Sequence, residues 1–453
     1  MSESGRGSFT SKLGIILATA GSAVGLGNIW RFPYMTGMNG GAAFILIYFL
    51  CVLLLGIPGM VAEFVVGRSS QSNAARAYNK LAGSTPWRVI GYLGVVTSMI
   101  ILGFYAVVAG WCLQYLTVSL TGQLHGDLGV VETYFATFSS DPWKPTLWAL
   151  CFIVLTHWVV AQGVRDGIER ASKLLMPTLL VLLVVLIVAS CMLPGASKGI
   201  EFLFKPDFSK VTGTVVLEAL GQAFFSLSLG TACLCTYASY FTRKTRLVRS
   251  AFQIALLDTL GAIFAGLMIF PAAFSVGVSP NSGPSLIFIT LPNVFQQAFA
   301  SMPAVGYVVS VLFYALLSLA ALTSTISMHE IGTAFFLEKL HWPRQRATWI
   351  LTVVCATMAV FCSLSVGANT DIQVLGLSLM DFCDYLTAQY MLPTGAFLTS
   401  IMLGWFVDRK LVHDEFAVGG SARESFFRVW LFSVRFIVPV CIVLIFLHQF
   451  GVI

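Results

Sequence analysis

Two runs of small residues interrupt long apolar segments, and their backbone atoms are the first candidates for binding chemistry. They are Ala20–Asn28, AGSAVGLGN, and Ser226–Thr231, SLSLGT. Glycine costs about 1 kcal/mol relative to alanine inside a helix, so both runs predict a broken helix. A break exposes carbonyl oxygens, which suit hard cations such as Na⁺, and N–H groups, which suit a carboxylate. Inside a membrane, such groups are tolerated only where something satisfies them.

The first run has other interpretations when it is taken alone. The spacing Gly21-x-x-x-Gly25 also favours close packing of two helices. The pair Gly25-x-Gly27 resembles part of a dinucleotide loop, although no strand precedes it. The second run lies five apolar segments later at a corresponding position, and this correspondence favours a binding site between two halves of the chain.

The sequence lacks the motifs of ATP-driven pumps, hydrolases, metalloproteases and ion channels. The sequence contains no G-x-x-x-x-G-K-[ST] loop, no H-E-x-x-H or G-x-S-x-G motif and no repeated pore filter, which disfavours a primary pump, an intramembrane enzyme and a channel. His329-Glu330 lacks a second histidine at the required spacing. The ten cysteines form no C-x-x-C pair and lie in apolar stretches, as expected of packed free thiols.

The composition indicates a membrane protein. Hydrophobic residues make up 57% of the 453 residues, charged residues make up 10%, and the mean hydropathy is +0.86. A soluble domain carries about 25% charged residues. This deficit excludes a soluble enzyme, a disordered chain and a nucleic-acid binder as leading interpretations, because the excess apolar surface must face lipid.

Roughly eleven apolar segments have the length of membrane-spanning helices, which need about 20 residues. These runs are too long and continuous for barrel strands, so the expected fold is all-α and integral to the membrane. The expected spans are residues 12–37, 42–67, 89–121, 146–164, 174–193, 213–240, 250–276, 304–337, 347–366, 372–403 and 429–450.

The basic residues predict how the chain is oriented. With the N-terminus inside the cell, the inner segments hold 20 of the 26 Lys and Arg residues and the outer loops hold 4, while Arg31 and Arg435 fall within spans. Cytoplasmic loops carry such an excess. We therefore expect a multi-pass protein of the plasma membrane with a cytoplasmic N-terminus and, after an odd number of spans, an outer C-terminus.

The two interrupted spans suggest an inverted repeat of five helices plus five, with one helix left over. The expected units are a cytoplasmic N-terminal segment (1–11), the first repeat (12–193), an outer loop (194–212), the second repeat (213–403), a cytoplasmic loop (404–428) and the additional eleventh helix (429–453).

Several motifs along the chain resemble those of the neurotransmitter:sodium symporter family. They include Gly21–Pro33 (GSAVGLGNIWRFP), Gly56-Ile-Pro58, Gly221–Gly230 (GQAFFSLSLG), Leu291-Pro-Asn293 and Leu322-Thr-Ser324. The resemblance extends from about residue 6 to about residue 405 and is closest to the bacterial amino-acid branch. It implies a LeuT-type inverted 5+5 repeat with broken helices 1 and 6, and Na⁺-coupled symport of amino acids by alternating access.

The resemblance implies two Na⁺ sites built from oxygen ligands. The first uses Ala23, Asn28, Ser226 and Asp258, and the second uses Gly21, Val24, Ala320, Thr323 and Ser324. Taken alone, hydroxyl residues such as Thr323 and Ser324 are more often bonded back to a carbonyl of their own helix. Asp258 replaces the commoner Asn of the family, and Ala262 replaces an acid. Our hypothesis is that Asp258 supplies the negative charge that chloride supplies elsewhere, so no chloride is required.

The resemblance also assigns a substrate site. Gly25 stands where monoamine carriers have Asp, so the substrate is expected to bring its own carboxylate, bound by Tyr105 and by the N–H groups of Leu26 and Gly27. Taken alone, a tyrosine such as Tyr105 is more often an ordinary packed aromatic, so its role rests on the resemblance. The mostly apolar pocket favours large hydrophobic or aromatic amino acids. Its other expected members are Ser22, Ala23, Ile101, Phe225, Ser226, Ser228, Thr231, Ser324, Thr325 and Met328.

Gates and moving parts complete the assignment. The outer gate is expected to pair Arg31 with Asp381 above Phe225. The inner gate is expected to pair Arg6 with Glu338, beside Phe9 and Tyr240, unless Arg6 and Glu338 are merely solvated ends. Glu63 is expected to accept hydrogen bonds from the unwound sixth helix. Gly167 and Pro177 either let the fifth span unwind or mark an ordinary helix start.

The expected partners are a small amino acid and the lipid bilayer, without nucleic acid, in a monomer or weak dimer. The principal alternative is a Na⁺-dependent amino-acid receptor of the same fold that transports nothing.

Overall fold

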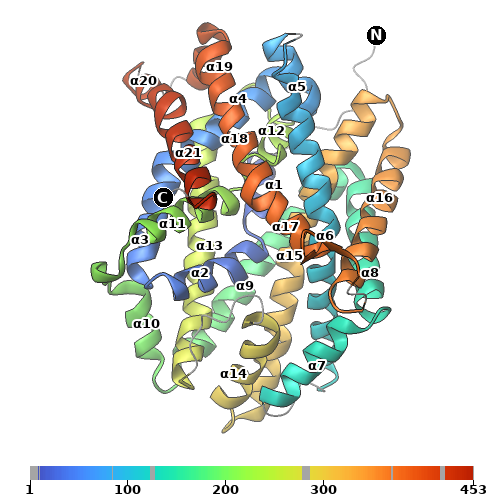
Figure 1. Ribbon diagram of the computed structural model, residues 1–453, viewed down its shortest axis with the longest axis vertical. Coiled ribbons are helices and arrows are strands. Elements are labelled where there is room, and N and C mark those ends of the chain that lie inside the picture. The colour runs from blue at the N-terminus through green and yellow to red at the C-terminus, as the bar shows by residue number, and fades with distance from the viewer. Residues whose placement is uncertain are drawn as a thin grey trace.

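The computed structural model describes residues 9, 11–83, 85–122, 128–277, 286–368, 371–418 and 424–451 of the chain. Long helices run along the long axis of the molecule, and several shorter helices lie at its two ends (Figure 1). The described residues also form one antiparallel hairpin, β1 (Gln373–Val374) with β2 (Leu377–Ser378), in which Gln373 faces Ser378 and Val374 faces Leu377.

The helices have the following bounds: α1 Lys12–Ala23, α2 Phe32–Met38, α3 Ala42–Cys51, α4 Ile57–Ser70, α5 Ala74–Ala82, α6 Arg88–Leu120, α7 Leu128–Ser140, α8 Lys144–Ala161, α9 Arg170–Cys191, α10 Ala196–Phe204, α11 Gly213–Ser226, α12 Cys233–Ala238, α13 Leu247–Ser275, α14 Leu291–Ala298, α15 Pro303–Lys339, α16 Arg344–Ser365, α17 Leu379–Tyr385, α18 Leu392–Ile401, α19 Arg409–Ala417, α20 Glu424–Phe432 and α21 Val438–Gln449. Several helices continue into one another through π-helical turns at Gly27–Arg31, Val52–Gly56, Val164–Glu169, Leu286–Thr290, Leu386–Met391, Met402–Phe406 and Ser433–Ile437, and Phe208–Lys210 forms a 3₁₀ turn.

The described residues contain eight continuous helices long and apolar enough to cross a membrane, or ten if each of two bent pairs is one span. One pair joins Lys12–Ala23 to Gly27–Met38 at 51°, and the other joins Leu379–Phe406 to Arg409–Ala417 at 108°. The expected sixth span is divided into α11 and the short α12. The all-helical membrane fold is therefore confirmed, while the count of eleven spans stays a prediction.

Two expected boundaries were misplaced. The fifth span begins at Val164 rather than 174, because the π-helical turn Val164–Glu169 leads directly into α9. The tenth was expected from residue 372, but the hairpin occupies that stretch and α17 begins only after Ser378, whose side chain accepts a hydrogen bond from the Asp381 N–H. Gly376, with φ of +80°, lies in the hairpin turn and makes this reversal possible.

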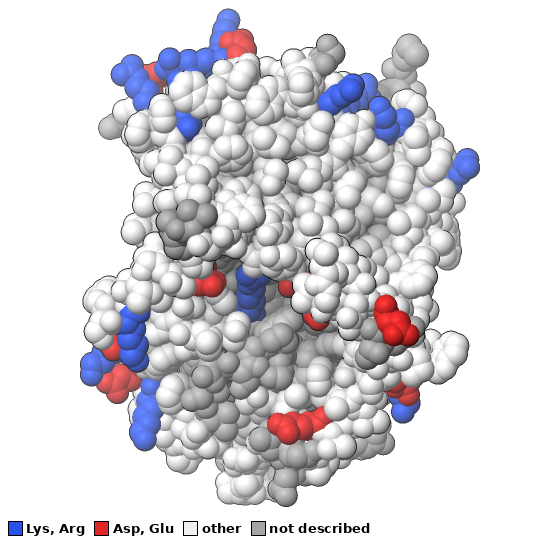
Figure 2. Space-filling view, viewed as in Figure 1, with Lys and Arg blue, Asp and Glu red and all other residues white. Residues whose placement is uncertain are grey.

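The outer surface of the bundle fits a lipid environment. Large apolar side chains such as Leu50, Trp158, Val181 and Phe361 are half or more exposed. Contiguous apolar surface of this extent is unfavourable in water. In Figure 2 the middle of the visible face is mostly uncharged, and Lys and Arg side chains fringe its upper end. The structure is that of a multi-pass membrane protein.

The two broken segments lie inside the bundle, where neighbouring helices surround them. The first helix, α1, packs against α9, α13 and α15, and α15 packs along α6. Most of α15 around its middle is buried, including Ala320 and Thr325. This packing brings the predicted site residues of α1, α6, α13 and α15 together inside the bundle.

Candidate functional site

The first break separates α1 from the π-helical turn that begins at Gly27. The backbone leaves the helical region at Val24, with φ of −74° and ψ of 87°. The Gly25 N–H donates to the Asn28 side-chain oxygen at 3.3 Å, and the Leu26 N–H donates to the Tyr105 hydroxyl at 3.2 Å. Side chains therefore satisfy N–H groups that lack helical partners, as burial in a membrane requires.

The second break lies between α11 and α12. Ser228 and Gly230 have φ of 54° and 81°, in the left-handed region, which ends the regular helix. The Gly230 N–H donates to Glu63 at 2.7 Å, and Ser98 donates to the Thr231 carbonyl at 2.6 Å. Glu63 is 2% exposed. Glu63 thus contacts the unwound segment, as the sequence analysis expected.

A buried carboxylate joins the two breaks. Asn28 donates to Asp258 Oδ1 at 2.8 Å, and Ser226 donates to Asp258 Oδ2 at 2.7 Å. Tyr48 donates to the same Oδ2 at 3.2 Å. None of these four residues is more than 2% exposed. The structure therefore brings together the three side chains predicted for the first Na⁺ site, and oxygen atoms of this kind suit a hard cation.

Tyr48 was missed by the sequence analysis. Its signal was indirect: an acid inside a span is costly and needs hydrogen-bond donors from neighbouring helices. Asp258 on α13 therefore needs a hydrogen-bond donor from another helix, and Tyr48 of the second span is one. Sequence spacing alone does not relate residues 210 positions apart.

The residues predicted for the second Na⁺ site lie where α1 meets α15. A side-chain carbon added at Gly21 would lie 3.4 Å from Thr323 Cβ, and one added at Gly25 would collide with the Ser324 hydroxyl. Thr323 also donates to the Ala320 carbonyl at 2.9 Å, the bond that the alternative interpretation expected. A hydroxyl that donates to its own helix still presents lone pairs to a cation.

Three of the predicted pocket residues share one apolar cluster. Met328 packs with Leu102 and Leu351, and Ile101 and Tyr105 pack against the same group. Tyr105 thus places its ring in this cluster and its hydroxyl at the first break. The arrangement offers an apolar wall with one polar group at its edge.

The hydroxyls predicted for the pocket have partners of their own. Ser22 donates to the Thr19 carbonyl at 2.6 Å, and Thr231 donates to the Ser228 carbonyl at 2.7 Å. Thr325 is fully buried and lies 2.8 Å from the Thr156 hydroxyl. In this geometry these hydroxyls cap the broken helix or join neighbouring helices.

Two of the residues predicted for the outer gate, Arg31 and Phe225, lie beside the first break. The Arg31 guanidinium lies 4.3 Å from the centre of the Phe225 ring, and Phe225 in turn faces Gly27. Asp381 accepts a hydrogen bond from Ser378 at 2.7 Å. Among the described residues, Arg31 and Asp381 do not form an ion pair, so their pairing stays a prediction. Figure 2 shows basic atoms flanked by acidic ones within a hollow of this face.

The predicted inner-gate residues form contacts as far as the structure describes them. Arg6 lies outside the described residues. Phe9 is buried, and its ring meets that of Tyr240 edge-on at 6.0 Å. The Tyr240 hydroxyl donates to Glu330 at 2.6 Å. Glu338 accepts hydrogen bonds from the Asn73 N–H at 2.8 Å and from its side chain at 3.0 Å.

Glu330 also forms a buried ion pair with Arg344, which the sequence analysis missed. Arg344 donates in addition to the Val160 carbonyl at 2.9 Å. This pair links the end of α8, the C-terminal part of α15 and the start of α16 to Tyr240, the tyrosine predicted for the inner gate.

The fifth span contacts the first near both predicted dynamic residues. Gly167 lies in the π-helical turn, where a side chain would collide with the Val159 carbonyl. Pro177 lies inside α9, and the preceding residue, Met176, lies against Gly21. A displacement of this part of α9 would therefore reach the residues predicted for the second Na⁺ site.

Arg68 forms a second cluster that the sequence analysis missed. It is 1% exposed, donates to Glu415 Oε2 at 2.6 Å, and also donates to the carbonyls of Glu415 and Thr245. The residue thereby fixes α19 and the segment before α13 to the end of α4.

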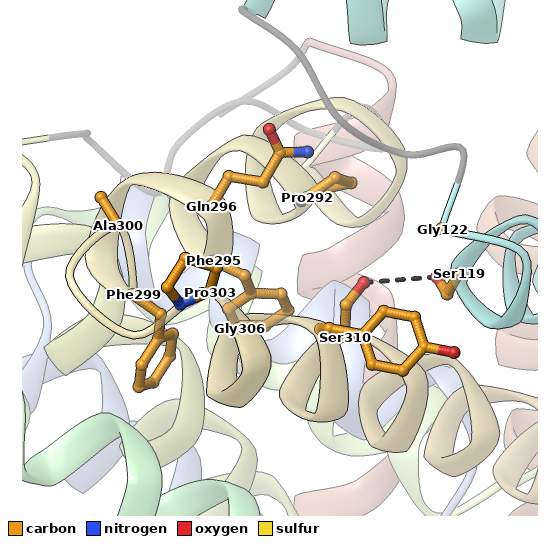
Figure 3. A pocket seen from close by; sticks show the side chains of 11 residues that line it. Ser119, Gly122, Pro292, Phe295, Gln296, Phe299, Ala300, Pro303, Gly306 and Ser310 are labelled. Carbon is orange, nitrogen blue, oxygen red and sulfur yellow. Dashed lines mark hydrogen bonds between the residues drawn. The ribbon is translucent and has the colours of Figure 1, made fainter.

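A separate cavity lies between α14, the start of α15 and the end of α6 (Figure 3). Its volume is about 170 Å³, and Phe295, Phe299 and Tyr307 contribute to its wall. Ser119 and Ser310 approach to 3.2 Å within it. None of the residues predicted for the ion or substrate sites lines this cavity.

Two broken helices that meet at a buried carboxylate, within a membrane-spanning bundle, are typical of secondary transporters. The family model described as "Sodium:neurotransmitter symporter family" matches residues 6–130 and 142–452. The chain belongs to this family, and it is a sodium-dependent transporter rather than an enzyme.

Similar proteins support the assignment over the whole chain. The uncharacterized sodium-dependent transporter YhdH of Bacillus subtilis is 39% identical, over 100% of this chain and 99% of the relative. An uncharacterized sodium-dependent transporter of Haemophilus influenzae is 32% identical, over 98% of each chain. The crystal structure of MhsT in complex with L-phenylalanine is similar with a TM-score of 0.88 and 42% identity, over 98% of this chain and 99% of that one.

Proposed function

We propose that this protein imports amino acids together with Na⁺, and that its substrates are large hydrophobic or aromatic amino acids. The observation that supports this substrate class is the absence of a side chain at Gly25, which faces Ser324 and Tyr105. Gly25 has no side chain, so this position offers no acid to pair a substrate amine, and a carbon added there would lie against the Ser324 hydroxyl. A substrate with its own carboxylate suits the adjacent Tyr105 hydroxyl. The similarity to MhsT, solved with L-phenylalanine, supports the same class.

Two Na⁺ sites are part of the proposal. The first consists of Ala23, Asn28, Ser226 and Asp258, and the hydrogen bonds among the last three support it. The second consists of Gly21, Val24, Ala320, Thr323 and Ser324, supported by the close approach of α1 to α15. Because Gly21 and Gly25 belong to the same break, occupation of the ion sites and of the substrate site is coupled through α1.

Transport is further proposed to be independent of chloride, because Asp258 supplies a fixed negative charge between the two breaks. The hydrogen bonds that its carboxylate accepts from three neutral donors support this role, because they stabilise the ionised form. Uptake in a medium with gluconate in place of chloride is expected to equal uptake in chloride. A clear loss of uptake in gluconate would contradict the proposed role of Asp258.

In the cell, the proposed arrangement is a monomer or weak dimer of the plasma membrane with the N-terminus in the cytoplasm. The excess of Lys and Arg on one set of connections supports this orientation.

Uptake into proteoliposomes tests the function directly. A mixture of labelled amino acids is supplied with an inward Na⁺ gradient, and with K⁺ in place of Na⁺ as the control. Accumulation above equilibrium that requires Na⁺ supports symport, and competition within the mixture identifies the substrate. Na⁺-dependent binding without accumulation would favour the receptor alternative, and no binding of any amino acid would contradict the assignment of Gly25 and Tyr105.

A further inference from the structure

A cavity rich in basic side chains lies outside both helix breaks, between α5, the start of α6 and the end of α15. Its volume is about 300 Å³. Arg76, Arg88, Lys339 and His341 line it from these three separate parts of the chain. It lies at the end of the bundle that the distribution of Lys and Arg assigns to the cytoplasm.

The three cations of this cavity have no carboxylate partner within the described part of the chain. None of Arg76, Arg88 and Lys339 approaches an Asp or Glu within 4.0 Å there. Other arginines of the protein, Arg68 and Arg344, are paired with buried or nearly buried acids. The cavity therefore holds positive charge that no described acid neutralises through an ion pair.

The only acid of the lining is already a hydrogen-bond acceptor. Glu338 accepts from the Asn73 N–H at 2.8 Å and from the Asn73 side chain at 3.0 Å. One carboxylate against two guanidinium groups and one ammonium group leaves a net positive lining. Such a lining is complementary to a phosphate group, which Arg binds through paired N–H donors.

Exposed apolar residues adjoin the cavity. Arg88 and Tyr92 of α6 line it, whereas Val89 and Val96 of the same helix are 56% and 48% exposed. Trp87 precedes this helix and packs on Phe406 at 4.8 Å between ring centres. Aromatic residues of this kind concentrate at the membrane–water boundary. The start of α6 thus presents one cation, Arg88, to the cavity and exposed apolar side chains beside it.

We propose that this cavity binds the phosphate group of an anionic phospholipid of the inner leaflet, such as phosphatidylglycerol. The headgroup phosphate contacts Arg76, Arg88 and Lys339, and an acyl chain lies along the exposed valines of α6. Basic pockets at the cytoplasmic ends of spanning helices bind such headgroups by this combination of charge and apolar contact. The inference is independent of the transported substrate, because it concerns residues outside both breaks.

Retention of lipid by the purified full-length protein tests the proposal. The protein is reconstituted in nanodiscs of phosphatidylcholine with about a quarter phosphatidylglycerol, extracted into detergent, and examined by native mass spectrometry. The test variant is R76Q/R88Q. The matched control is K244Q/R249Q, which removes two exposed basic residues from the same end but outside the cavity.

The wild type and the control are expected to retain phosphatidylglycerol, whereas R76Q/R88Q is expected to weaken retention about tenfold or more, since each basic residue near a lipid headgroup contributes severalfold. Inorganic phosphate at about 10 mM is expected neither to bind nor to displace the lipid, because it lacks the acyl chain. Equal losses in the test and control variants would overturn the proposal. Displacement by inorganic phosphate would overturn it in favour of a soluble anion.

A second variant guards against misfolding. If R76Q/R88Q fails to elute as a single species on size exclusion, Lys339→Gln is examined in the same way, with Lys244→Gln as its control. Lys339→Gln is expected to weaken retention about fivefold, as removal of one headgroup contact predicts. Retention that is unchanged in Lys339→Gln, in a well-folded protein, would contradict the proposed contact.

Discussion

At Asp258, a single carboxylate receives side-chain hydrogen bonds from three helical segments. Asn28 comes from the first break, Ser226 from the end of α11 and Tyr48 from α3. A buried acid is retained in a membrane when it has partners or a function. These donors are all neutral, so none of them cancels the negative charge. The residue is therefore positioned to attract a cation.

Replacement of Asp258 by asparagine tests this charge while keeping the size of the side chain. Na⁺-dependent uptake in chloride-free medium is expected to fall about tenfold or more, which corresponds to about 1.4 kcal/mol. Addition of chloride is expected to restore part of the activity, because an anion replaces the lost charge. Tyr48→Phe is the control, since it removes one hydrogen bond and leaves the charge. Uptake by Asp258→Asn that equals the wild type in both media would contradict this role.

Gly25 gives a second test at the residue scale. An alanine there would place a carbon against the Ser324 hydroxyl and within 3.4 Å of the Tyr105 hydroxyl. Gly25→Ala is expected to weaken amino-acid binding about tenfold or more, measured by scintillation proximity with labelled substrate. Gly221→Ala on α11 is the matched control, because nothing lies within 4 Å of the added carbon. Equal affinities in the two variants would show that Gly25 does not limit the site.

At the scale of elements, the two broken helices are held by partners from other helices. Glu63 of α4 bonds the Gly230 N–H, and Ser98 of α6 bonds the Thr231 carbonyl. These bonds replace the helical bonds lost at the break. Because they come from separate helices, the shape of the break depends on the surrounding bundle as well as on its own glycine.

The sequence predicts some of these elements and not others, for physical reasons. Long apolar runs and the glycines of Ala20–Asn28 are local signals, so the spans and the breaks can be predicted. The helices α5 and α10 have nine residues each, too few to be recognised as membrane spans, so the sequence did not predict them. Partners such as Tyr48 depend on tertiary packing, which brings residues distant in sequence together and leaves no local pattern.

Glu63→Ala is expected to destabilise the fold by about 2 kcal/mol, because it leaves the buried Gly230 N–H without an acceptor. Thermal unfolding in detergent, followed by a thiol-reactive dye, measures the change. Glu201→Ala is the control, since it removes only an exposed pair with Lys205 on α10. A loss of stability at Glu63 no larger than that at Glu201 would mean that the bond is dispensable.

Arg68 provides the corresponding test at the other end of the bundle. Arg68→Ala leaves Glu415 without its close partner and two carbonyls without a donor, so a loss of about 3 kcal/mol is expected. Arg243→Ala removes an exposed arginine that lies 3.8 Å from the same Glu415, and it is expected to cost less than about 0.5 kcal/mol. Denaturation in detergent compares the two variants. Similar losses would contradict the special role of the buried arginine.

At the scale of the whole molecule, the distribution of charge relative to the bundle determines how the protein lies in the membrane. In the view of Figure 2, Lys and Arg side chains gather at the upper end, and others lie beside acidic side chains in the lower half and in the central hollow. A chain in which 20 of 26 basic residues fall on one set of connections is expected to keep that side in the cytoplasm.

Epitope tags at the two termini test this orientation. An N-terminal tag is expected to bind antibody only after the cells are permeabilised, and a C-terminal tag is expected to bind it in intact cells or spheroplasts. Proteins tagged at either end must retain Na⁺-dependent uptake, which excludes misinsertion as the cause. Protection of both tags in intact cells would require an even number of spans instead of eleven.

One continuous helix lies beside the hinge of α1. The 37 residues of α15 extend about 55 Å, at 1.5 Å per residue, whereas the hydrocarbon core is about 30 Å thick. The helix is therefore a rod that projects beyond the bilayer, with Thr323 and Ser324 along its length and Glu338 near its inner end. At the proposed second Na⁺ site, an ion between this rod and the jointed α1 would resist a change in the joint rather than in the rod. Because α15 is continuous and α1 is jointed, such an ion would restrain α1 alone. Any movement of α15 at the ion would also move its far end at Glu338.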